Sequence, residues 1–103
     1  MKRQEIISQL GGIELKNIDL TGVTLSTERL KISEEDKEFE DAVFECLCNP
    51  IEENKVHAIE EFWDCVQVRL SYLELALKIN AQEVMEGYSE HLKKLEHRPR
   101  KKE

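Results

Sequence analysis

Apolar residues recur at helical spacing through two long stretches of the chain, residues 26–48 and 53–79. Within each stretch they return every three or four positions, which is the period of a helix that packs on one side. The short connector "PIEEN" separates the stretches. Helices joined by so short a connector pack as an antiparallel hairpin. The pattern therefore predicts an all-α fold built on two long helices.

Capping and helix-breaking residues set the limits of the first long helix. Ser26 and Thr27 are both suitable N-caps, and Ser33-x-x-Asp36 offers a competing capping box further along. The helix must end by Asn49-Pro50, because the residue before a proline disfavours helical geometry. We expect the second long helix to begin near Glu53, directly after the connector.

The two ends of the chain are shorter and less regular. Residues 1–10 have the apolar spacing of a short amphipathic helix. Residues 13–26 alternate apolar and polar positions and are interpreted as an ordered loop, with a short strand as the alternative. Asn80 and Glu83 form a capping-box variant that opens a last helix, which Pro99 closes. These limits divide the chain into residues 1–24, a helical domain at 25–97 and a basic tail at 98–103.

The composition supports a helical fold class, and the sequence also indicates where in the cell the protein is located. The chain has only four Gly and two Pro, which favours helices over a turn-rich β fold. It contains no signal-peptide pattern and no apolar run near 18 residues. We therefore expect a soluble, cytoplasmic protein without a membrane partner. Cys46, Cys48 and Cys65 lack zinc-ligand spacing and are interpreted as buried small hydrophobic residues.

Charge is unevenly distributed along the chain. The formal net charge is −7, but the last 13 residues carry six Lys or Arg against two Glu, which leaves the first 90 residues at −11. So acidic a body argues against a nucleic-acid partner, because binding to a phosphate backbone needs a basic surface. A small basic region beside it suits a metal-bound anionic ligand better.

Helical periodicity sorts the acids of the first long helix by the direction in which they project. At about 100° per residue, Glu35 falls among the apolar residues of the buried face and Glu38 lies at the border of that face. Glu34 projects roughly the opposite way. Because a buried carboxylate without a partner is costly, the inward-facing Glu35 predicts a nearby cation.

The second long helix is apolar on two sides. We predict that the core face is the larger stripe, which contains Ile59, Phe62, Trp63, Val66, Leu70, Leu73 and Leu77. Val68, Tyr72 and Leu75 form a second stripe about 180° away. Glu61 and Asp64 continue this second stripe toward the start of the helix. A helix apolar on both sides lies between two layers, so we expect a homodimer or homotetramer to complete the bundle.

The hairpin brings the two sets of acids to the same level. Reflecting positions about the connector places Asp64 opposite Phe39, within about a turn of Glu38. Glu35, Glu38, Glu61 and Asp64 are then able to converge between the helices. Four carboxylates repel one another strongly in a dry site unless hard cations bind there. Sites rich in oxygen ligands suit Mg²⁺ or Mn²⁺.

The acidic motifs resemble those of a known family. "EEDKE" reads as E-E-x-x-E and "EFWD" as E-x-x-D, with 22 residues between them. Together with the basic end "YSEHLKKLEHRPRK", they are similar to the MazG-like, all-α nucleotide pyrophosphohydrolases over roughly residues 25–102. The chain differs from the family pattern at Lys37 and Trp63, where many relatives have a small residue.

The resemblance implies a reaction and a set of roles. The reaction is Mg²⁺-dependent attack of water between the α- and β-phosphates of a nucleoside triphosphate, which releases pyrophosphate and a nucleoside monophosphate. Glu34 is implied to be an outer-shell residue or the residue that activates water. The implied metal ligands are Glu35, Glu38, Glu61 and Asp64.

Some residues keep two interpretations. The C-terminal region contains the basic residues Lys93, Lys94, Arg98 and Arg100. These side chains either contact substrate phosphates or complement the dipole of the last helix. The histidines, His57 included, show no spacing typical of a shared site and are predicted at the surface. A different class of function also stays open, a catalytically silent helical module for dimerisation or partner binding.

Overall fold

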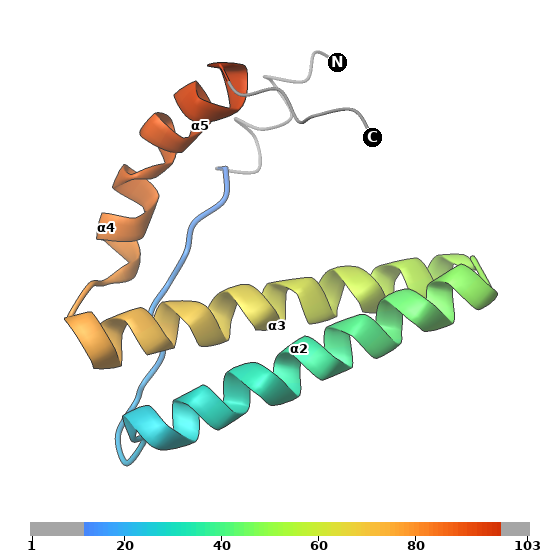
Figure 1. Cartoon of the computed structure of the whole chain (residues 1–103), viewed down its shortest axis with the longest axis horizontal. Helices are drawn as coiled ribbons and strands as arrows, with labels where there is room; N and C mark the ends of the chain where they lie inside the picture. Colours follow the sequence, from blue (N-terminus) through green and yellow to red (C-terminus); the bar gives the residue numbers. More distant parts are fainter. Residues whose placement is uncertain (1–11, 98–103) are drawn as a thin grey trace. The chain divides into compact units, whose positions relative to one another are not determined.

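The computed structural model describes residues 12–97, which form four α-helices and contain no β-strand. The predicted all-α class is therefore confirmed. The predicted helix at residues 1–10 and the basic tail at 98–103 lie outside the described residues. The helices are α2 (Leu25–Cys48), α3 (Glu52–Leu77), α4 (Ala81–Glu86) and α5 (Tyr88–His97), as labelled in Figure 1.

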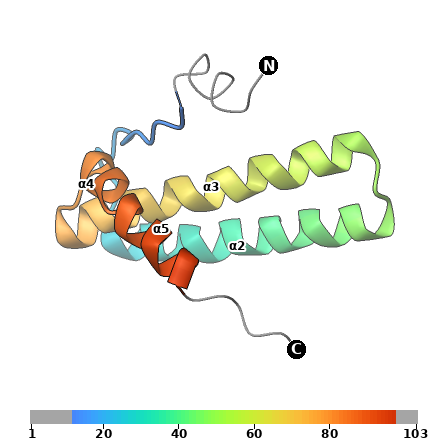
Figure 2. The same cartoon turned by 90° about the horizontal axis from the view of Figure 1, so that it is seen from above.

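The two long helices form an antiparallel hairpin within one compact unit, residues 17–80. Figure 1 and Figure 2 both show α2 and α3 running side by side. Residues 12–16 belong with α4 and α5 to a second unit, in which the backbone N–H of Leu15 donates to Sδ of Met85 over 3.3 Å. Within residues 12–97, no helix combines the length and the apolar content that crossing a bilayer requires.

α2 begins earlier than predicted, because its N-cap is Thr24 rather than Ser26 or Thr27. The hydroxyl of Thr24 accepts a hydrogen bond from the backbone N–H of Thr27, and the hydroxyl of Thr27 accepts one from the backbone N–H of Thr24, each over 3.1 Å. This reciprocal capping box satisfies two donors that the first turn leaves free. At the other end α2 stops at Cys48, as the following Pro50 predicts.

α3 ends two residues earlier than predicted. Lys78 adopts the left-handed conformation, with φ 58° and ψ 31°. Its backbone N–H donates to the carbonyl of Glu74 over 3.0 Å, and the N–H of Ile79 donates to the carbonyl of Leu73 over 3.3 Å. Such bonds satisfy carbonyls at a helix C-terminus and turn the chain out of the helix.

The prediction of one continuous last helix is wrong, because Gly87 separates α4 from α5. The backbone N–H of Gly87 is shared between the carbonyls of Val84 and Glu83, at 3.1 and 3.3 Å. Glycine disfavours a helix interior, since it loses more backbone freedom than other residues when it becomes helical. The apolar spacing continues across this position, so periodicity alone does not reveal the break.

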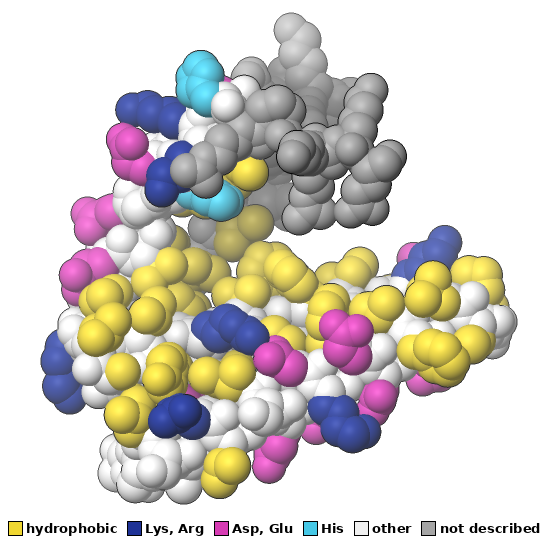
Figure 3. All heavy atoms as spheres, in the orientation of Figure 1, with side chains coloured by type: hydrophobic (Ala, Val, Ile, Leu, Met, Phe, Trp, Pro, Cys, Tyr) yellow, Lys and Arg dark blue, Asp and Glu magenta, His cyan; other side chains and the backbone are white. Residues whose placement is uncertain are grey.

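The predicted core face of α3 is exposed in its first half, whereas Leu70 in its second half is buried at 4% exposure. Ile59, Phe62 and Trp63 are 58%, 46% and 42% exposed, whereas Cys65 and Val68, on the other side of the helix, are buried. Trp63 packs edge-on against Phe62 at a centroid distance of 5.3 Å, at the surface rather than in a core. Figure 3 shows hydrophobic side chains gathered along α3 on the face in view. The buried residues are Glu28, Glu35 and Ala42 in α2 and Cys65, Val68, Leu70 and Ser71 in α3.

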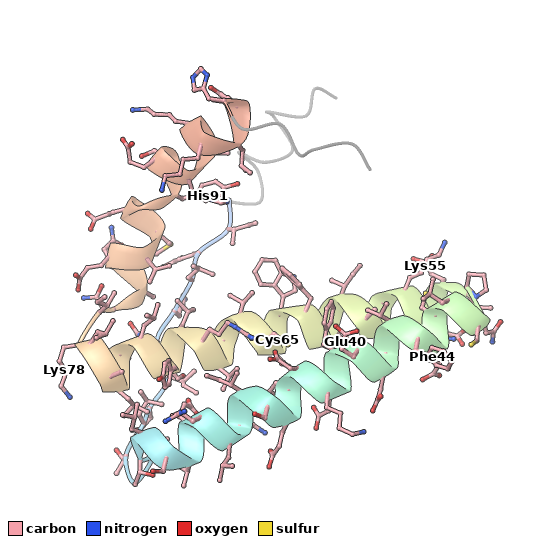
Figure 4. All side chains as sticks on the ribbon, in the orientation of Figure 1. Glu40, Phe44, Lys55, Cys65, Lys78 and His91 are labelled. Carbon is pink, nitrogen blue, oxygen red and sulfur yellow. The ribbon has the colours of Figure 1, made fainter. Side chains whose placement is uncertain are left out.

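Burial of the cysteines follows their position on the hairpin. Cys65 is buried, Cys46 is half-buried and Cys48, the last residue of α2, is exposed. The expectation of three buried thiols was therefore wrong for Cys48. The thiol of Cys65 donates to the backbone carbonyl of Glu35 over 3.3 Å, and in Figure 4 its side chain lies where the two helices meet. This contact lies at the level where Cys65 of α3 pairs with Glu35 of α2.

Candidate metal centre

Three carboxylates from the two long helices converge between them. Glu35 and Glu38 of α2 and Glu61 of α3 each offer one oxygen, and these oxygens all lie within 4.8 Å of one another. Residues three apart on a helix are neighbours on its surface, which explains the pairing of Glu35 with Glu38. The antiparallel packing brings Glu61 to them from the other helix. We call these three residues the carboxylate cluster.

The members of the cluster differ in burial. Glu35 is 6% exposed, whereas Glu38 is exposed at the edge, as the helical periodicity predicts. Oε2 of Glu35 and Oε2 of Glu61 are both buried and have no hydrogen-bond partner. A buried carboxylate oxygen without a partner is costly, and most buried polar atoms in proteins are satisfied. Two such oxygens beside a third carboxylate supply oxygen donors of the kind that a cation site needs.

Each inward-facing glutamate has a basic residue one helical turn before it. Nζ of Lys31 lies 2.9 Å from Oε1 of Glu35, and Nε2 of His57 lies 3.1 Å from Oε1 of Glu61. In both glutamates Oε1 is partnered and Oε2 is not. Neither basic residue was predicted to belong to the site; their i, i+4 spacing from the glutamates is visible in the sequence, but the burial of those glutamates is not.

Negative charge accumulates at the cluster. The Glu35 carboxylate is the main cause of the raised pKa of Glu38, and desolvation and Glu61 raise it further. The hydrogen bond to Glu35 is the main cause of the raised pKa of Lys31, to which the charges of Glu34 and Glu38 also contribute. Like charges at this separation disfavour ionisation, and a bound divalent cation reverses that effect.

Asp64 lies apart from the three gathered carboxylates. It is exposed, and it does not belong to the group formed by Glu35, Glu38 and Glu61. The helix pairing explains the difference, because Phe39 contacts Phe62, with ring centroids 6.1 Å apart, instead of facing Asp64. The hairpin therefore pairs at a level about two residues away from the one obtained by reflection about the connector. In this conformation three of the four predicted ligands come together.

The proposed water-activating residue and the two positions that depart from the family pattern are exposed. The side chain of Glu34 is 65% exposed, and its Oε2 lies 3.9 Å from Nζ of Lys31. Lys37 pairs with Asp41 over 3.0 Å with 78% of its side chain exposed. Trp63 is also at the surface. Neither bulky residue lies between the helices, so neither forces them apart at the cluster.

The basic residues assigned to phosphate binding are only partly described. Nζ of Lys93 pairs with Oε1 of Glu90 in α5 over 3.2 Å, and Lys94 is exposed in the last turn of that helix. Arg98 and Arg100 lie outside the described residues. A role for these four side chains on substrate phosphates stays a prediction.

Comparisons with known families, with curated proteins and with solved structures find no match for this chain. The arrangement of the side chains must therefore carry the functional argument. The donors of the cluster are carboxylate oxygens, while the nearby thiol of Cys65 is engaged with a backbone carbonyl. Oxygen donors of this kind fit hard cations such as Mg²⁺ and Mn²⁺.

Proposed function

We propose that this protein is a Mg²⁺-dependent nucleoside triphosphate pyrophosphohydrolase, for which Mn²⁺ is an alternative metal. The observation that carries the proposal is the pair of buried, unpartnered oxygens, Oε2 of Glu35 and Oε2 of Glu61, presented beside Glu38 from two antiparallel helices. The resemblance of the two acidic motifs to MazG-like enzymes supplies the class of reaction. In this proposal Asp64 is a fourth ligand, which joins the cluster by moving its exposed side chain.

Different residues of the chain have different roles in the proposed reaction. A metal held by the cluster supplies charge neutralisation for the triphosphate and promotes ionisation of water. Glu34, exposed on the same turn of α2, accepts the proton that the attacking water releases. The water oxygen bonds to the α-phosphorus while the bond from that phosphorus to the bridging oxygen breaks. Pyrophosphate and the nucleoside monophosphate leave, with Lys93, Lys94, Arg98 and Arg100 proposed to contact the phosphates.

Assembly into a homodimer or homotetramer is part of the proposal. It is supported by large apolar side chains that the described residues leave in solvent, among them Phe44 at 68% and Leu47 at 76% exposure. Burying such side chains contributes roughly 25 cal/mol for each Å² removed from water. Sedimentation of the full chain tests this part, and a monomer at micromolar concentration would overturn it.

A second candidate, a catalytically silent partner-binding module, is favoured by a groove elsewhere on the hairpin. The groove has a volume of about 430 Å³, and Asp36 and Arg69 at its wall form an ion pair between the helices at 2.9 Å. Asp36 lies on the side of α2 away from Glu38, so this groove is distinct from the cluster. Its lining residues are Asp36, Phe39, Glu40, Phe62, Cys65, Val66 and Arg69.

Thermal unfolding with and without metal separates the two candidates. A ligand that binds only the native state raises the melting temperature, so Mg²⁺ or Mn²⁺ is expected to stabilise the wild type. The shift should disappear in Glu35→Gln and persist in Glu45→Gln, which alters an exposed acid of the same helix. Pyrophosphate release, screened across nucleoside triphosphates, then tests the reaction. No metal-induced shift and no release would favour the silent module.

A further inference from the structure

Lys31 places a permanent positive charge on the carboxylate cluster. Its Nζ lies 2.9 Å from Oε1 of Glu35 and 3.9 Å from Oε2 of Glu34, and half of its side chain remains exposed. The contact joins an exposed cation to a carboxylate whose side chain is only 9% exposed. Such an arrangement differs from an ordinary surface ion pair, because one partner depends on the contact for its compensation.

The cluster needs positive charge when no metal is bound. Carboxylates within 4.8 Å of one another repel strongly when all are ionised. Two basic side chains contact the cluster directly, Lys31 at Glu35 and His57 at Glu61. The Lys31 contact is the shorter one, at 2.9 Å against 3.1 Å, and it is made to the more buried side chain, since Glu35 is 9% exposed and Glu61 is 15% exposed. Lys31 is therefore the more effective neutralising group for the metal-free site.

We propose that Lys31 is a resident counter-ion of the metal site, which neutralises the cluster in the metal-free protein and competes with the divalent cation for Glu35. This inference rests on the proposed metal centre. A cation that approaches Glu35 meets the ammonium group at short range, and two like charges there repel. The flexible stem of Lys31 and its half-exposed position allow the ammonium group to withdraw into water when the metal enters.

Removing the positive charge of Lys31 is expected to change both the stability of the metal-free protein and its affinity for metal. The metal-free protein loses compensation for Glu35 and becomes less stable, because an ionised carboxylate is left buried without a partner. The metal meets less repulsion and binds more tightly. A merely positioning role of Lys31, in which it orients Glu35 for the metal, predicts the opposite sign, since loss of an orienting partner weakens metal binding.

The test measures binding of Mn²⁺ alone, without nucleotide, to the full chain. Lys31→Met and Lys31→Gln remove the charge, Lys31→Arg keeps it, and Lys37→Met is the matched control. Lys37 makes the same i, i+4 type of pair on the same helix, with Asp41 at 3.0 Å, but both side chains are largely exposed. Calorimetric titration gives the Mn²⁺ affinity, and thermal unfolding is followed in chelator and in saturating Mn²⁺. Circular dichroism confirms that each variant is folded.

Lys31→Met and Lys31→Gln are expected to bind Mn²⁺ about three- to tenfold more tightly than the wild type, the range for a screened charge near a divalent ion. Lys31→Arg should bind no more tightly than the wild type, and Lys37→Met should stay within about twofold of it. In chelator the melting temperature of Lys31→Met should fall, and saturating Mn²⁺ should close the gap to the wild type.

Unchanged or weaker Mn²⁺ binding in both uncharged variants would overturn the counter-ion role. If the wild type still binds Mn²⁺ in that case, the proposed metal centre stands while the inference fails. If neither the wild type nor any variant binds Mn²⁺, both the metal centre and the inference are overturned. Lys31→Gln makes the result independent of how one substituted side chain packs.

Discussion

The thiol of Cys65 in α3 donates a hydrogen bond to the backbone carbonyl of Glu35 in α2, 3.3 Å away across the hairpin. Both residues are buried, at 8% and 6% exposure. The contact lies beside the carboxylate cluster, because the side chain of the same Glu35 belongs to that cluster with Glu61 of α3. The geometry of the carboxylate cluster therefore depends on the pairing of the two helices, and the reactivity of Cys65 is expected to report on that pairing.

Thiol labelling is expected to distinguish Cys65 from Cys48. Burial raises the pKa of Cys65, which lowers its thiolate fraction, whereas Cys48 is exposed. Because the thiolate is the reactive form and access is also needed, Cys48 should react with an aromatic disulfide reagent at least about a hundredfold faster than Cys65 at pH 8. Single-cysteine variants allow each rate to be measured. Equal rates would contradict the packing of the hairpin, and saturating Mn²⁺ should slow Cys65 further.

Substitutions at Glu35, Glu61 and Glu34 are expected to separate metal binding from catalysis. Glu35→Gln and Glu61→Gln each remove a ligand with a buried oxygen, so Mn²⁺ affinity should fall by at least roughly a hundredfold, beyond the usual effect of losing an outer-shell partner. Glu34→Gln should keep Mn²⁺ affinity within about threefold and lose most pyrophosphate release, since its proposed role is proton transfer. Titration calorimetry and a pyrophosphate assay measure the two effects, with Glu45→Gln as the control.

Glu38 is expected to make metal-free stability depend on pH. The Glu35 carboxylate raises the pKa of Glu38 above its ordinary value of 4.5, so the folded protein holds that proton more tightly than the unfolded chain does. The stability that protonation contributes is present below pH 4.5 and is lost as the pH rises through the raised pKa. Glu38→Gln, which mimics the neutral form, should therefore melt higher than the wild type at pH 7 in chelator.

Low pH and saturating Mn²⁺ are two control conditions for the Glu38→Gln variant. Below about pH 4.5 the advantage of Glu38→Gln should vanish, because wild-type Glu38 is then protonated in both states. Saturating Mn²⁺ at pH 7 should reverse the order, since only the wild type keeps all its ligands. A Glu38→Gln variant that melts below the wild type in chelator at pH 7 would contradict repulsion within the cluster.

The long helices and the inward direction of Glu35 were predictable from the sequence, because helical periodicity and capping residues determine them locally. The side of α3 that faces α2 was not predictable from the sequence. That helix is apolar on two sides, and periodicity does not decide between stripes that a partner helix could cover equally. Val68 of the smaller stripe is buried. In the larger stripe Ile59 and Trp63 remain in solvent, and Leu70 is buried.

The candidate site was predicted in part for a related reason. Reflection about the connector gives the approximate position of each residue along the hairpin. It does not give that position to within one helical turn, and it does not give the rotation of a helix about its own axis. It placed both Glu61 and Asp64 near the acids of α2, whereas the helix pairing brings only Glu61 to Glu35 and Glu38. The roles of Lys31 and His57 depend on which carboxylates are buried, so the sequence showed their spacing but not their importance.

Asp64 is expected to contribute less to metal affinity than the ligands of the cluster. Its side chain is exposed in the metal-free protein, so binding must order it at a cost in conformational entropy of roughly 1 kcal/mol, which offsets much of the gain from one more carboxylate. Asp64→Asn should therefore weaken Mn²⁺ binding by about tenfold or less, against at least roughly a hundredfold for Glu61→Gln. Titration of both variants under one condition checks the ratio. Equal losses would show that Asp64 is as fully engaged as Glu61 once metal is bound, whereas no loss in Asp64→Asn would remove it from the ligand set and leave a site of three carboxylates.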